Sequence, residues 1–117
     1  MSDKETAAAM FKMADQFIDV ANRLVEGESI DMGEVGAALR YAAARFNAHE
    51  AAYKATDLAA ERNDALAWFS SQYNEMLEEN LDQHIKYFED KKRSLSLSIN
   101  LTRSLSGLAD RNEKKQI

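Results

Sequence analysis

The sequence predicts an all-α fold, in which an antiparallel three-helix bundle is followed by an additional C-terminal amphipathic helix. The 117 residues include no proline and only four glycines, which are the residues that most strongly interrupt helices. Apolar residues recur at intervals of three and four along most of the chain, which is the period of one helix face. Residues 37–48 are rich in alanine, the strongest helix former, and we expect them to form the central helix.

The first predicted helix begins near Ser2 or Asp3, either of which can cap it, and continues to about residue 25. Gly27 follows the last apolar pair and is expected to end this helix. The spacing of its apolar residues is typical of a helix with one buried face. These residues are Ala7, Met10, Phe11, Ala14, Phe17, Ile18, Ala21, Leu24 and Val25.

The second predicted helix runs from about residue 32 to the mid-fifties, and Asp31 and Glu34 hold the two ends of a first turn that resembles a capping box. We expect the next turn within residues 54–63, because the apolar period falters there and an unbroken helix of about 60 residues would be unusual. The third helix then continues to about residue 90. Its apolar stripe is Leu66, Phe69, Tyr73, Met76, Leu77, Leu81, His84, Ile85 and Phe88.

Arg45 lies on or beside the packing stripe of the second helix, one turn from both Tyr41 and His49. A buried guanidinium needs a carboxylate or several carbonyl groups, because an unpaired buried charge is very costly. The sequence therefore predicts a buried ion pair at Arg45. An acidic band on the third helix could supply the carboxylate, and the alternative is that this band is a solvated face. The band consists of Glu75, Glu78, Glu79 and Asp82.

Three separated segments resemble a family of small bacterial proteins that is catalogued as a domain of unknown function, family 3144 in that series. The segments are FxxADxFIxxAN at 11–22, YAAARFNA at 41–48 and FxxQYxxMLEENLD at 69–82. The resemblance covers about residues 8–90 and implies a compact helical domain in a bacterial cell. It implies no activity, so it transfers no functional residue to this chain.

The charges divide the chain into two parts, which we interpret as a helical bundle domain at 1–90 and a basic amphipathic arm at 91–117. Residues 1–90 hold 8 basic and 18 acidic residues, a net charge of −10, whereas residues 91–117 hold 7 basic and 2 acidic residues, a net charge of +5. An acidic body does not offer the clustered cations that phosphate contacts need, so we expect no binding of nucleic acid.

The arm is the feature that is most informative about function. Residues 94–101 alternate between polar and apolar types, which is a strand pattern, but no other segment offers a strand as its partner. We therefore predict a fourth helix with a leucine face and flanking cations, either separate from the third helix or continuous with it. The residues expected to bind a partner are Lys91, Lys92, Arg93, Leu97, Leu101, Arg103, Leu105 and Leu108.

Few residues suggest chemistry. The absence of cysteine excludes disulfides and thiolate ligands, and no serine accompanies a recognisable histidine–acid pair. His49 and His84 could share a metal or small molecule between antiparallel helices two and three. The favoured interpretation is that both are hydrogen-bonded to neighbours, because the Glu-x-x-His pairs of di-iron bundles are missing. We predict no enzyme activity, no catalytic residue and no cofactor.

The predicted function is that of a non-enzymatic interaction or adaptor protein, a homodimer that self-associates through its arm. Two alternatives remain: the basic arm binds an anionic membrane surface or a different protein, or the histidines bind a ligand. The N-terminal residues lack the pattern of a signal peptide, and no apolar run approaches the length of a membrane span. The expected location is the cytoplasm.

Overall fold

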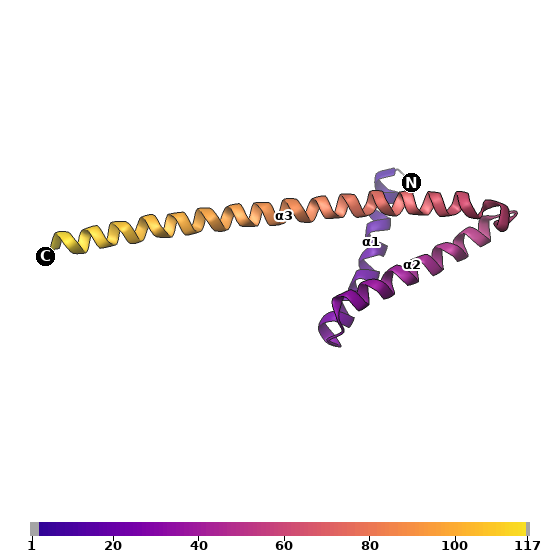
Figure 1. The fold of residues 1–117 in the computed structure, drawn as a ribbon, viewed down its shortest axis with the longest axis horizontal. Helices are drawn as coiled ribbons and strands as arrows, with labels where there is room; N and C mark the ends of the chain where they lie inside the picture. Colours follow the sequence, from indigo (N-terminus) through magenta and orange to yellow (C-terminus); the bar gives the residue numbers. More distant parts are fainter. Residues whose placement is uncertain (1–2, 117) are drawn as a thin grey trace. The chain divides into compact units, whose positions relative to one another are not determined.

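The computed structural model describes residues 3–116, with side chains as far as residue 105. Within this range the chain forms helices and short connections, which confirms the all-α prediction (Figure 1). Helix α1 spans Asp3–Asn22, the π-helical turn η1 spans Arg23–Gly27, α2 spans Met32–Lys54, and α3 spans Leu58–Gln116. The chain divides into two compact units, Met1–Ala65 and Leu66–Ile117.

The helical segment that starts with α1 ends at Gly27, as predicted, but glycine is not the residue that reverses the chain. The backbone N–H of Glu28 donates to the carbonyl of Arg23 at 3.2 Å, a spacing of five residues that widens the last turn into a π-helix. The left-handed backbone conformation belongs instead to Ser29, whose φ is 55°. Ile30 then donates its N–H to the carbonyl of Leu24 at 3.1 Å, which closes the connection.

Helix α2 begins where the sequence predicts. Asp31 is its N-cap, and its Oδ2 accepts a hydrogen bond from the N–H of Glu34 at 3.2 Å. Val35 lies one turn further on. Among the residues that the structure describes, it is the one hydrophobic residue that is buried, with 6% of its surface exposed. Half-buried residues of η1 and of the loop, Leu24, Val25 and Ile30, belong to the same end of the unit, where α1 and η1 contact α2.

The turn between α2 and α3 is shorter than the predicted range and occupies residues 55–57. The side chains of Asp57 and Glu61 both accept backbone hydrogen bonds where the turn ends and α3 begins. Asp57 Oδ1 accepts the N–H of Ala60 at 3.3 Å, and Glu61 Oε2 accepts the N–H of Asp57 at 2.9 Å. Residues 58–63, which we expected to lie in the turn, are therefore the first turns of α3. The acidic side chain of Glu61 is favourable there because a helix N-terminus is electropositive.

Helix α3 contains 59 residues and continues without interruption through the boundary predicted at residue 91. The alternative in which the arm continues the third helix is thus the one that the structure shows. No glycine or proline occurs between Gly36 and Gly107, so neither residue interrupts the helix there. Every residue from 70 to 105 is exposed. The antiparallel bundle remains a prediction.

Candidate interaction surface

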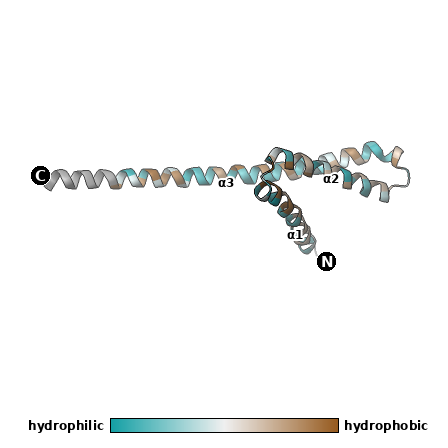
Figure 2. Cartoon of the chain, turned by 90° about the horizontal axis from the view of Figure 1, so that it is seen from below, coloured by the Kyte–Doolittle hydropathy of each residue, from teal (hydrophilic) through white to brown (hydrophobic). Residues whose placement is uncertain are grey.

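The second compact unit consists of α3 alone, and its apolar side chains have no other element of that unit to pack against. Figure 2 shows brown hydrophobic residues interspersed with teal hydrophilic ones along this helix as far as its grey part. The exposed fractions of its large apolar residues lie between 42% and 63% from Tyr73 to Leu105. Exposed apolar residues in such a number make this helix a candidate interaction surface.

These apolar residues lie on two sides of α3, because successive residues of an α-helix are rotated by about 100°. Leu81, Ile85 and Phe88 from the predicted stripe share one side with Leu95 and Ile99. Leu97, Leu101 and Leu105 lie together, as predicted for the leucine face of the arm, but on a different side of the helix. Leu108 lies outside the described side chains.

Several polar side chains on α3 bond to the helix itself. The His84 Nδ1 lies 2.8 Å from the carbonyl oxygen of Asn80, and because a carbonyl only accepts, Nδ1–H is the donor. Thr102 Oγ1 donates to the carbonyl of Ser98 at 2.9 Å, and Asn80 Nδ2 donates to that of Met76 at 2.7 Å. Groups that already have such partners can enter an interface at less cost than unpaired ones.

Aromatic contacts on α3 are also local. Trp68 and Phe69 meet edge to face with 4.9 Å between ring centroids, and Tyr87 and Phe88 do so at 5.3 Å. The Lys91 ammonium lies 6.0 Å from the centroid of the Tyr87 ring, within the range of a weak cation–π contact. The first cation of the arm is thereby held beside the last aromatic residues of the acidic segment.

The charges of α3 change sign abruptly. Residues 75–90 hold six acidic residues and one basic residue, a net charge of −5, while residues 91–105 hold four basic residues and no acidic one, a net charge of +4. The predicted arm cations Lys91, Lys92, Arg93 and Arg103 are all exposed. One continuous helix thus presents an acidic half next to a basic half.

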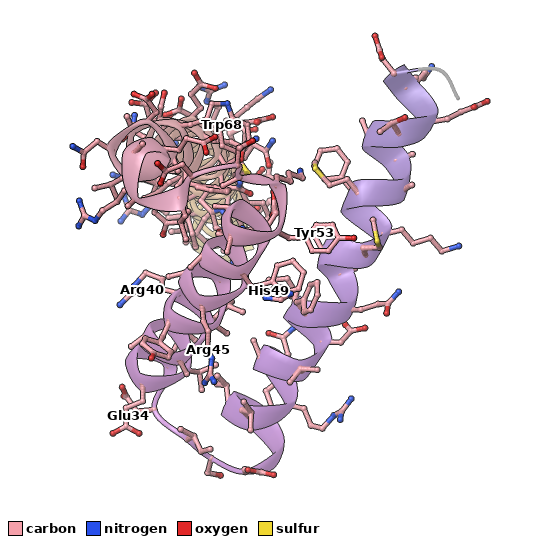
Figure 3. The ribbon with its side chains drawn as sticks, turned by 90° about the vertical axis from the view of Figure 1, so that its right-hand side faces the viewer. Glu34, Arg40, Arg45, His49, Tyr53 and Trp68 are labelled. Atoms are coloured by element: carbon pink, nitrogen blue, oxygen red, sulfur yellow. The ribbon has the colours of Figure 1, made fainter. Side chains whose placement is uncertain are left out.

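The buried ion pair predicted at Arg45 stays a prediction, and in the single chain Arg45 is exposed on α2. The reason is that the face beside it is itself uncovered, with Tyr41, Phe46 and Tyr53 exposed by 70%, 66% and 86%. In Figure 3, Arg40 projects from the side of α2 opposite to His49 and Tyr53. The ion pair seen on α2 joins Lys54 Nζ to Glu50 Oε2 at 3.6 Å.

The two histidines belong to different compact units, and each has contacts within its own helix. His84 bonds to its own helix, and the His49 ring lies 6.4 Å from that of Phe46, tilted by 55°. Among the residues that the structure describes, no three histidine or acidic side chains gather as ligands for a metal ion. In that same part of the chain, no helix is long and apolar enough to cross a membrane.

The chain matches the model of a known protein family. The family described as "Protein of unknown function (DUF3144)" matches residues 10–85. The chain belongs to the DUF3144 family. No curated protein and no solved structure matches it. The DUF3144 match covers most of α1, all of α2 and α3 as far as Ile85, and it ends before the basic residues that begin at Lys91.

Proposed function

We propose that this DUF3144 protein is a non-enzymatic interaction protein that self-associates through the basic part of α3. The observation that carries the proposal is the unbroken α3, whose residues 70–105 are all exposed and whose two halves carry opposite charge. A lone helix gains little stability in water, and most helices in proteins depend on burying an apolar face. Residues 75–105 therefore need a partner in order to bury theirs.

The continuity of α3 favours a second copy as that partner. The basic segment 91–105 and the acidic segment 75–90 belong to one helix, so the first cannot fold back onto the second within a chain. The basic segment of one chain can contact the acidic segment of another chain. Their opposite charges both attract the partners and favour the correct pairing. In this proposal the bundle expected from the sequence is completed by helices of two molecules, and the cytoplasmic location remains a prediction.

The test reverses the charge of the arm in the full-length chain, with Lys91→Glu, Lys92→Glu and Arg93→Glu combined. We expect the parent protein to have the mass of a dimer in light scattering and the variant to dissociate at least tenfold more readily. A matched control, with Lys4→Glu, Lys12→Glu and Arg23→Glu, changes the net charge equally but lies outside α3, and it should remain dimeric.

Two outcomes would reject the proposal. A parent protein that is monomeric at all concentrations would exclude self-association, and an arm variant that dimerises as well as the parent would place the interface elsewhere. Flotation with anionic phosphatidylserine vesicles distinguishes self-association from binding of the arm to a membrane surface. Binding of a monomeric parent protein, lost on reversal of the arm, would assign the cations to lipid headgroups instead.

A further inference from the structure

We propose that residues 75–105 of α3 pair antiparallel with the same segment of a second copy, about a twofold axis close to Asp90. This inference rests on the proposed self-association and adds the orientation and the register of the two helices. It follows from three features of this segment: the spacing of its apolar residues, their symmetry about Asp90 and the order of its charges.

The spacing is that of a coiled coil. From residue 81 onward, a single stripe follows intervals of four and three residues, and five of its seven members are large apolar residues. All seven are exposed and therefore available to a partner helix. The stripe consists of Leu81, Ile85, Phe88, Lys92, Leu95, Ile99 and Thr102.

The stripe is nearly symmetric about Asp90. Residues at equal distances before and after Asp90 face each other when two copies lie antiparallel about that point. Leu81 then faces Ile99 of the second copy, and Ile85 faces Leu95 of the second copy. In heptad terms each such layer combines one a position with one d position. Large apolar residues are thus matched in these two layers, each of which occurs twice in the pair.

The order of the charges selects this direction. Antiparallel pairing about Asp90 lays the acidic segment 75–90 of each copy along the basic segment 91–105 of the other, so that a net charge of −5 meets one of +4 twice. Parallel pairing would instead place acidic beside acidic and basic beside basic, which is unfavourable. At the outer end of the overlap, Glu75 and Arg103 of opposite copies occupy matching flanking positions.

The central layer contains the one cation of the stripe. Lys92 faces Phe88 of the second copy, so its methylene stem can cover the ring while the ammonium reaches the edge of the helix pair. An ammonium over an aromatic ring is also favourable in itself, and Lys91 already lies beside Tyr87 within one chain. Thr102, the other polar member of the stripe, donates to its own helix. A single lysine in such a stripe fixes the register.

The natural absence of cysteine allows the orientation to be tested directly. Leu81→Cys and Ile99→Cys are introduced into separate full-length chains, one of them tagged, and the chains are mixed in a glutathione redox buffer. A disulfide needs Cα atoms within about 7 Å of each other. The two copies of residue 81 lie about 27 Å apart in the antiparallel pair, at 1.5 Å of rise per residue. We expect the mixed disulfide as the main product and no disulfide from the Leu81→Cys chain alone.

A second pair of variants, Asp82→Cys with Ser96→Cys, occupies flanking positions beside the stripe of the same kind as Glu75 and Arg103. It should give the same result without altering an apolar residue. A disulfide formed by Leu81→Cys chains alone would show parallel pairing and overturn this inference, while self-association would stand. A dimer of the parent protein that yields the mixed disulfide in neither pair of variants would place the interface elsewhere and also overturn it. A monomeric parent protein would overturn both proposals together.

Discussion

Val35 and Arg45 lie on the same helix and have opposite environments. Val35 is 6% exposed at the contact between α2 and the end of the first helical segment, whereas Arg45 is exposed beside aromatic residues that are also uncovered. The sequence pattern placed Arg45 on or beside a packing stripe, because a period of three and four identifies a face but not what covers it. Because Val35 is buried and Arg45 is exposed, we expect truncation to alanine to change the free energy of unfolding differently at the two positions.

We expect Arg45→Ala to change the free energy of unfolding by less than about 0.5 kcal/mol, as is usual for exposed positions without a special role. Val35→Ala should destabilise by more than about 1 kcal/mol, because it removes buried methyl groups. Urea unfolding at one fixed protein concentration measures both. A loss of several kcal/mol in the Arg45 variant would show that the guanidinium is buried and paired in the assembled protein.

For individual helices and turns, the sequence predicts a boundary well where a side chain close in the sequence determines it. The start of α2 was predictable because Asp31 is an N-cap whose effect depends on the next three residues. The short turn at 55–57 was placed too broadly, because the polar residues 61–64 suggest a loop when read as composition. In the structure, Glu61 instead accepts the N–H of Asp57 and so belongs to the beginning of a helix.

Helix α3 departs most from expectation. A helix of about 60 residues is unusual in compact domains, but the first 49 residues of α3, 58–106, contain neither glycine nor proline to interrupt it. The strand-like alternation at 94–101 arises because two apolar faces, one with Leu95 and Ile99 and one with Leu97 and Leu101, interleave along one helix. Periodicity within a short window could not distinguish these cases.

Proline at position 100 should interrupt this helix. Asn100 lies on α3 away from the proposed stripe, so Asn100→Pro acts on the backbone, by removing a hydrogen bond and clashing with the preceding turn. We expect a loss of helical signal in far-UV circular dichroism and a weakening of dimerisation by at least tenfold. Asn100→Ala is the control and should preserve both. Dimerisation unaffected by the proline would show that the part of α3 beyond residue 99 plays no role.

For the whole molecule, the composition and the burial of the chain have to be considered together. Hydrophobic residues make up 45% of the sequence, which is an ordinary value for a globular protein. Yet among the hydrophobic residues that the structure describes, Val35 is the one that is buried. The charge of the candidate surface could be foreseen from the sequence, but the predicted leucine face of Leu97, Leu101 and Leu105 lies on another side of α3 than the proposed stripe. The symmetric register of the stripe could not be foreseen, since that requires the arm and the third helix to form one element.

If folding and association are coupled, stability depends on protein concentration. We expect the melting temperature of the full-length protein to rise with concentration. The triple charge reversal at residues 91–93 should lower the melting temperature and shift this dependence to higher concentration. Differential scanning fluorimetry with an extrinsic dye, over a hundredfold range of concentration, measures both effects. A melting temperature of the parent protein that is independent of concentration would contradict the coupling.

The single tryptophan provides an intrinsic probe for such measurements. Trp68 lies near the start of α3, is 57% exposed and meets Phe69 edge to face. It lies outside the overlap of 75–105 and on a side of the helix away from the stripe. We therefore expect its fluorescence to report the local melting of this end of the helix, and, if two chains pair as proposed, we expect the chromophore to stay accessible to a soluble quencher.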